Sequence, residues 1–228
     1  MTQRHELRWG GFAGLAFLFF AFLGALLPGT PPRVTATDTE IIAYIKDHET
    51  GLLLAALMFA ASAGLVIWFS AALAEALRER DERSDVHMAL LAGSVLVAGS
   101  MFMGAAGSAA MTYGIDNRSP ELTVMMFEGL MVLYALSGLT AVLPIAAAGV
   151  GVLRTKMLPN WLGYLGLVSA AVSALGALAV FAQTGDYVPG GPFMSWISLL
   201  AGGVFVLCAS IFMVREHLPE MTPMGSPI

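Results

Sequence analysis

Stretches of about 20 apolar residues recur along this 228-residue chain, and they constrain its fold more than any other feature. A helix of that length and polarity is long enough to cross the hydrocarbon core of a bilayer. Backbone groups in hydrocarbon must satisfy their own hydrogen bonds, so each crossing segment has to be helical. Only 12% of the residues are charged, about half the fraction typical of a soluble domain. The sequence therefore predicts an all-α integral membrane protein.

Six spans are predicted, which makes residues 1–228 a single integral membrane domain. The connectors are rich in Pro, Gly, Asp and Arg, as water-exposed turns are. The first apolar run follows Arg4 and Arg8, but it is longer than the apolar region of a secretory signal and no small-residue cleavage pattern follows it. We therefore expect a retained first helix. The predicted spans lie near residues 9–27, 51–73, 88–113, 130–153, 161–182 and 194–214.

The distribution of basic residues predicts the orientation, because cytoplasmic loops of membrane proteins are enriched in Lys and Arg. With an even number of spans, both termini share a side with the second and fourth connectors between spans. The opposite side carries only Arg33, Lys46 and Arg118. We therefore expect a multi-pass protein of the inner (plasma) membrane with both termini in the cytoplasm. The basic residues on the expected cytoplasmic side are Arg4, Arg8, Arg78, Arg80, Arg83, Arg154, Lys156 and Arg215.

A short helix is predicted in the outer connector between the first two spans. Thr37 and Glu40 have the spacing of a capping box, in which each side chain accepts a hydrogen bond from the other residue's backbone. Ile41, Ile42 and Ile45 follow on one face of the helix. Such an amphipathic helix is typical of a segment that lies on the surface of a bilayer. The predicted fold is therefore a six-helix transmembrane bundle with a short amphipathic outer helix.

Small residues at helical spacing mark two spans as packing elements. Ser100, Gly104 and Ser108 are spaced by four in the third span, and Gly163 and Gly166 begin a similar stripe in the fifth. Small side chains let helix backbones approach closely within a membrane. We expect these two spans to be central in the bundle. Packing within one chain is the favoured interpretation, and a seam between copies of the chain is the alternative.

Glu128 is the only acidic residue well inside a long apolar stretch. A helix over residues 122–153 is about 48 Å long, whereas the hydrocarbon core of a bilayer is about 30 Å thick. If Arg154 marks the inner end, Glu128 lies in the outer headgroup region. The alternative is a carboxylate that faces an outward cavity, where it binds a cation or carries a proton.

The predicted outer ends of the spans bring further polar residues near Glu128. These ligand or ion candidates are His48, Glu49, Tyr113 and Asp116. A histidine with several carboxylates suits a divalent metal or general acid–base chemistry. Their spacing matches no ligand motif, and the lone Cys208 excludes a multi-cysteine metal site. The sequence therefore predicts no metal and no cofactor, and assigns no catalytic residue.

Two segments of the chain form a recognisable pattern. The first, residues 40–77, runs from an acidic short helix through Asp47-His48-Glu49 into an Ala- and Leu-rich span. The second is Leu153-Arg154-Thr155-Lys156 followed by Leu158-Pro159-Asn160-Trp161-Leu162-Gly163. With these segments the chain resembles a family of small six-helix bacterial integral membrane proteins of unknown function. The resemblance implies the six-helix architecture and supplies no catalytic residues.

The favoured function is the binding or movement of a lipid-like or small hydrophobic molecule, without enzymatic activity. It follows from the small-residue stripes and the scarcity of charge within the spans, and it predicts an apolar cavity. One alternative is a structural or regulatory subunit of a membrane complex. Another is a membrane enzyme with an outer carboxylate site, using Glu128 with His48 or Asp116. The expected partners are membrane lipids and either a second copy of the chain or another membrane protein, with no nucleic acid.

Overall fold

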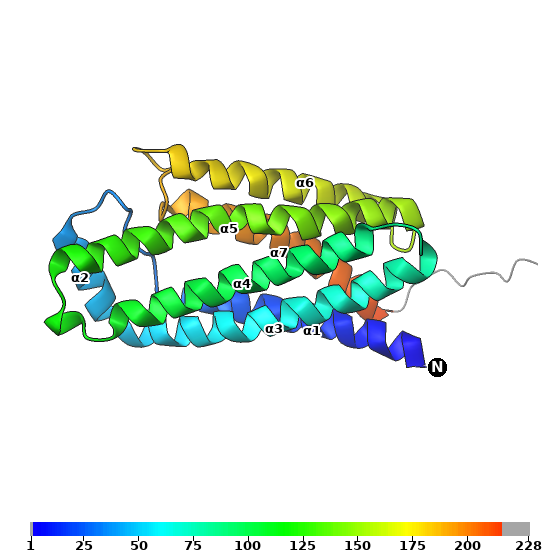
Figure 1. Cartoon of the computed structure of the whole chain (residues 1–228), viewed down its shortest axis with the longest axis horizontal. Helices are drawn as coiled ribbons and strands as arrows, with labels where there is room; N and C mark the ends of the chain where they lie inside the picture. Colours follow the sequence, from blue (N-terminus) through cyan, green and yellow to red (C-terminus); the bar gives the residue numbers. More distant parts are fainter. Residues whose placement is uncertain (1, 216–228) are drawn as a thin grey trace, which may run out of the picture.

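The computed structural model describes residues 2–215, with side chains described for residues 6–191, 196–197 and 199–215. All regular structure within that range is helical, which confirms the all-α prediction (Figure 1). The elements are α1 (Thr2–Leu26), α2 (Asp38–Asp47), α3 (Glu49–Arg80), α4 (Val86–Thr112), the 3-10 turn η1 (Ile115–Asn117), α5 (Pro120–Thr155), α6 (Asn160–Ala177), the 3-10 turn η2 (Leu178–Phe181) and α7 (Pro192–Arg215).

Five helical stretches in the described residues are long and apolar enough to cross a membrane. They indicate a multi-pass membrane protein. α7 contains a shorter apolar stretch, Leu199–Arg215, which overlaps the sixth predicted span, 194–214. α5 begins ten residues before its predicted span because Ser119 caps it and Pro120 occupies the first turn. The long stretches are Glu6–Leu26, Glu49–Arg80, Val86–Thr112, Pro120–Thr155 and Asn160–Phe181.

The six long helices form a ring. Each packs on the next in the order α1, α3, α4, α5, α6, α7, and α7 returns to pack on α1. The expectation that the third and fifth spans are central is therefore wrong. α4 packs mainly on α3 and α5, and α6 packs mainly on α5 and α7. The physical reason is that small-residue stripes produce close pairwise contacts, and such contacts need no central helix.

The predicted small-residue stripes lie in these pairwise contacts. A Cβ added at Gly163 would lie 2.9 Å from the Gly149 carbonyl oxygen, and one added at Gly166 would lie 3.1 Å from the Gly149 Cα. A Cβ added at Gly104 would lie 2.6 Å from the Tyr134 ring. The stripe in α6 thus allows that helix to pack closely on one side of α5. The stripe in α4 does the same on the other side.

Ion pairs join the connectors at each end of the ring. At one end, Arg154 in the last turn of α5 contacts Asp81 at 2.9 Å, in the second connector between long helices, α3–α4. At the opposite end, where α2 lies, Lys46 contacts Asp116 at 2.7 Å. The N-terminus lies at the end away from α2 (Figure 1). The connectors assigned to each side by the basic residues therefore lie together.

The predicted capping box of α2 is confirmed. The Thr37 N–H donates to the Glu40 carboxylate at 3.0 Å, and the Glu40 N–H donates to the Thr37 hydroxyl at 3.4 Å. These hydrogen bonds lower the pKa of the Glu40 carboxyl from its ordinary value. Ile41 and Ile45 are fully buried against the bundle, in a cluster that includes Phe127. These two side chains therefore face protein rather than lipid, because the first turns of α5 offer them an apolar surface.

Candidate functional site

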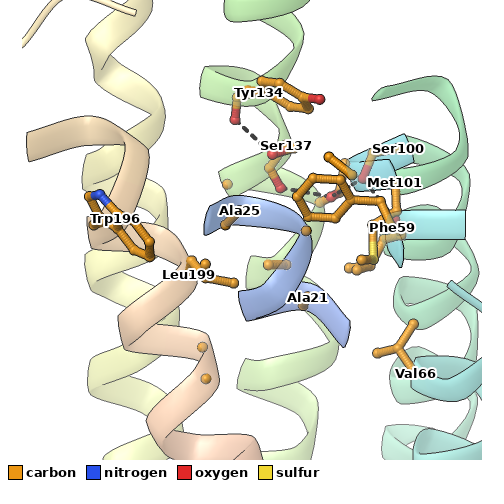
Figure 2. A pocket seen from close by; sticks show the side chains of 18 of the residues that line it. Ala21, Ala25, Phe59, Val66, Ser100, Met101, Tyr134, Ser137, Trp196 and Leu199 are labelled. Carbon is orange, nitrogen blue, oxygen red and sulfur yellow. Dashed lines mark hydrogen bonds between the residues drawn. The ribbon is translucent and has the colours of Figure 1, made fainter. Parts of the chain in front are cut away.

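A cavity of about 450 Å³, partly open to the outside, lies within the ring of helices. Its walls come from α1, α3, α4, α5 and α7, whereas α6 contributes none of the lining residues. This volume lies within the range of about 300–1,000 Å³ that is typical of small-molecule sites. Figure 2 shows Ala21 and Ala25 of α1, Phe59 and Val66 of α3, Met101 of α4, and Trp196 and Leu199 of α7 around the cavity.

The cavity exists because small residues face one another across the ring. α1 presents Ala21, Gly24 and Ala25, and α5 presents Ala135 and Gly138 among the lining residues. α1 and α5 are not one of the closely packed helix pairs. Six helices in a ring leave a central space that only large side chains can fill. At these positions the sequence supplies alanine and glycine instead, so the space stays open.

Charge is absent from the lining. No Asp, Glu, Lys, Arg or His is found among the residues described around the cavity. Its polar groups are a tryptophan and a set of hydroxyls. A charged group that entered would lose its hydration without gaining a countercharge, which is costly. The cavity therefore suits uncharged molecules. The hydroxyls belong to Thr30, Tyr44, Ser70, Ser94, Ser100, Ser108, Tyr134, Ser137 and Thr140.

Most of these hydroxyls are arranged as pairs between neighbouring helices along α4. Towards the end away from α2, the oxygens of Ser94 and Ser70 are 2.7 Å apart. Towards the α2 end, the Ser108 hydroxyl lies 2.9 Å from that of Tyr134. Residues 94 and 108 are separated by about 21 Å of helix. An elongated molecule would therefore meet hydroxyl groups at several depths.

Connectors close the end of the cavity near α2. Residues 28–31, between α1 and α2, and residues 189–190, before α7, both line it. The Val34 N–H donates to the Pro189 carbonyl at 3.4 Å, and Arg33 pairs with Asp186 at 2.5 Å. These interactions hold the two connectors together over the cavity. Because the ion pair is largely exposed, it is worth only about 0–1 kcal/mol.

Tyr44 of α2 lies beside this closure. The His48 ring stacks on the Tyr44 ring with centroids 4.8 Å apart. The His48 Nδ1 lies 3.0 Å from the Tyr44 carbonyl oxygen. A carbonyl can only accept, so Nδ1 carries the proton. Burial, with a smaller contribution from Tyr134, raises the pKa of the Tyr44 phenol to about 12. Tyr44 is therefore uncharged, like the rest of the lining.

We expect the Tyr44 phenol to ionise at a higher pH than an exposed tyrosine, near pH 12 instead of 10.0. The change to test is Tyr44→Phe, and the measurement is the phenolate absorbance of wild type minus variant across an alkaline titration. The difference should have its midpoint near pH 12. The buried neutral phenol makes its full contribution to the free energy of unfolding below pH 10.0, the ordinary pKa of tyrosine. That contribution is lost as the pH rises towards 12. A midpoint near pH 10.0 would contradict burial of this phenol.

None of the five sequence-derived ligand candidates lines the cavity. Glu128, Glu49 and Tyr113 are exposed. Asp116 pairs with Lys46, and His48 packs on Tyr44, as described above. Within residues 2–215, no group of three or more His, Cys, Asp or Glu side chains is placed to hold a metal ion. The structure therefore does not gather these residues into one site, and their role stays a prediction.

Sequence reasoning missed most of the cavity hydroxyls. Ser100 and Ser108 were noted only as small packing residues, and their partners on α5 were not identified. A signal was present, because Tyr134, Ser137 and Thr140 follow one another at intervals of three along a helical span. That spacing places them near one face of a helix.

The comparisons give a family but no functional relative. A family model described as a domain of unknown function (DUF4386) matches residues 11–219. No curated protein and no solved structure matches the chain.

Proposed function

The chain belongs to the DUF4386 family, whose description states no activity, and we propose from the cavity that it binds or moves an uncharged, lipid-like or small hydrophobic molecule within the membrane. The observation that carries the proposal is the composition of the lining, which combines apolar walls and hydroxyls with no charged side chain among the described residues. Small-molecule sites typically have mainly apolar walls with a few polar groups that orient the ligand.

The proposed topology has six spans, with α7 as the sixth and α2 at the outer surface. α7 has 24 residues, or about 36 Å of helix, which exceeds the hydrocarbon thickness of about 30 Å. It also completes the ring, where Gly11 of α1 approaches the Ser210 carbonyl closely. The basic residues favour cytoplasmic termini, and the inner (plasma) membrane is the proposed location.

Replacing Gly203 by leucine tests the proposal by filling the cavity. Gly203 lines the cavity, and an added Cβ would make ordinary contacts with Leu18 and Phe22 at 3.5 Å. The backbone therefore accepts the side chain, and its outer atoms occupy space inside the ring. We expect the purified variant to lose most of the hydrophobic molecule that accompanies the wild-type protein. Native mass spectrometry after mild detergent extraction measures this.

Gly99→Leu is the matched control. Gly99 is an exposed glycine of α4, and an added Cβ would meet no atom within 4 Å. Both substitutions replace a helical glycine and gain about 0.5–1 kcal/mol of helix preference. Gly99→Leu should keep the bound molecule. If Gly203→Leu keeps the same molecule in the same amount, or if wild type carries none and takes up no hydrophobic probe, the proposed function is wrong.

A further inference from the structure

The hydroxyls in the middle of the cavity donate their protons within their own helices. Ser100 donates to the Val97 carbonyl at 2.8 Å, Ser137 to the Tyr134 carbonyl at 2.7 Å and Thr140 to the Ser137 carbonyl at 2.7 Å. A hydroxyl has one proton and two acceptor lone pairs. Each of these oxygens therefore presents acceptor capacity to the cavity and no uncommitted proton.

Two of these oxygens approach each other from different helices. The Ser100 and Thr140 hydroxyls are 3.3 Å apart across the α4–α5 contact. For either one to donate to the other, or to a ligand, it would have to give up its bond to a backbone carbonyl. A ligand hydroxyl that donates to this pair requires no such exchange. Figure 2 shows Ser100 and Ser137 at the cavity wall, and its dashed lines include the hydrogen bonds of Ser100 with Thr140 and of Ser137 with the Tyr134 carbonyl.

The size of the cavity limits the rest of the ligand. A volume of about 450 Å³ is in the lower part of the range for drug-sized ligands. It accommodates a single chain or a fused-ring skeleton, and it is too small to enclose a phospholipid with two acyl chains. Phe59, Met101 and Leu199 supply apolar walls near the hydroxyl cluster. The charge-free lining disfavours a carboxylate or phosphate group.

We infer that the ligand is an uncharged lipid alcohol, with a single chain or a fused-ring skeleton, whose hydroxyl donates a hydrogen bond to the cluster formed by Ser100, Ser137 and Thr140. This inference deepens the proposed function and rests on the same cavity. Ethers and ketones of the same shape can only accept hydrogen bonds, so they gain no hydrogen bond from this cluster and we expect them to bind more weakly. Fatty acids bind more weakly because their carboxylate is charged at neutral pH.

Competition among three probes of equal chain length tests the inference. Purified full-length protein in mild detergent is loaded with radiolabelled hexadecanol and challenged with hexadecanol, hexadecyl methyl ether or palmitate. We expect saturable binding of hexadecanol, and about tenfold weaker competition by the ether. That factor corresponds to one hydrogen bond of about 1.4 kcal/mol. Palmitate should compete more weakly than hexadecanol.

Thr140→Val identifies the hydrogen bond, because valine keeps the shape of threonine and removes its oxygen. The variant should bind hexadecanol about tenfold more weakly and the ether with unchanged affinity. Thr123→Val is the matched control, since Thr123 of α5 also donates to a nearby backbone carbonyl, that of the N-cap residue Ser119, but does not line the cavity. It should leave both affinities unchanged. A structural role for Thr140 would instead weaken the two probes equally.

The outcomes separate this inference from the proposed function. If the ether and the alcohol bind equally and Gly203→Leu removes both, the cavity is the site and the inference of an alcohol is overturned. Equal competition by palmitate and hexadecanol would overturn the argument from charge. If no probe binds saturably and no molecule accompanies the purified protein, the proposed function itself fails.

Discussion

Replacing Gly149 by leucine is expected to separate α5 from α6 and to lower the free energy of unfolding by about 3 kcal/mol, the upper end of the usual cost of overpacking. A Cβ added at Gly149 would lie 2.8 Å from the Gly163 carbonyl oxygen and 3.2 Å from the Leu167 nitrogen. Both are backbone atoms, so neither can rotate away. Relief therefore requires the two helices to move apart, which disrupts the contact that their small residues create.

Thermal unfolding of the purified protein in detergent measures this effect. The control is Gly129→Leu in the same helix, because Gly129 is exposed and an added Cβ meets nothing within 4 Å. Both variants gain the same helix preference, so the control should be as stable as wild type or slightly more stable. Equal melting temperatures for the two variants would show that the α5–α6 contact tolerates a side chain.

Arg118→Ala is expected to cost about 1.5–3 kcal/mol, the usual value of a hydrogen bond that involves a charged group. The Arg118 guanidinium donates to the carbonyls of Ala110 at 3.1 Å, Met111 at 3.3 Å and Tyr113 at 2.6 Å. The last carbonyls of a helix have no partner within it, and the negative end of the helix dipole also favours a cation there. Arg118 therefore caps α4, and its loss should loosen η1 and the last turn of α4.

Hydrogen exchange localises this effect, and thermal unfolding gives its size. Exchange should rise in residues 108–117 and remain unchanged at the inner end of the helices. Arg118→Lys should restore part of the loss, because an ammonium supplies the charge without the planar fork of donors. Arg33→Ala is the control, since Arg33 makes an exposed ion pair worth about 0–1 kcal/mol. Equal losses for Arg33→Ala and Arg118→Ala would contradict the capping role.

Local patterns predicted the helices well because each depends on nearby residues. Apolar runs located the long helices, and the spacing of Thr37 and Glu40 located the start of α2. The same patterns could not show how the helices meet. Ile41 and Ile45 have the same apolar character whether they face lipid or protein. Their burial depends on the outer end of α5, which lies about 80 residues further along the chain.

The candidate site was harder to predict because the charged side chains described lie outside the cavity. The sequence search favoured Glu128, His48 and Asp116, since acids and histidines carry most recognisable chemistry. All three lie outside the cavity, where the ionisable groups keep contact with water or with one another. The cavity is marked instead by alanines, glycines and hydroxyls, and such residues are common in any membrane helix. Only the ring arrangement shows which of them face inward.

The contact between α1 and α7 has a consequence for biosynthesis. Ribosomes make the chain from its N-terminus, so α7 is produced after the other five long helices. Until it arrives, the side of the ring that holds Trp196 and Leu199 is open to the surrounding lipid. Docking of α7 on Gly11 and Gly14 then closes the wall. The last helix to be made therefore both completes the fold and supplies the wall that separates the central space from the lipid on that side.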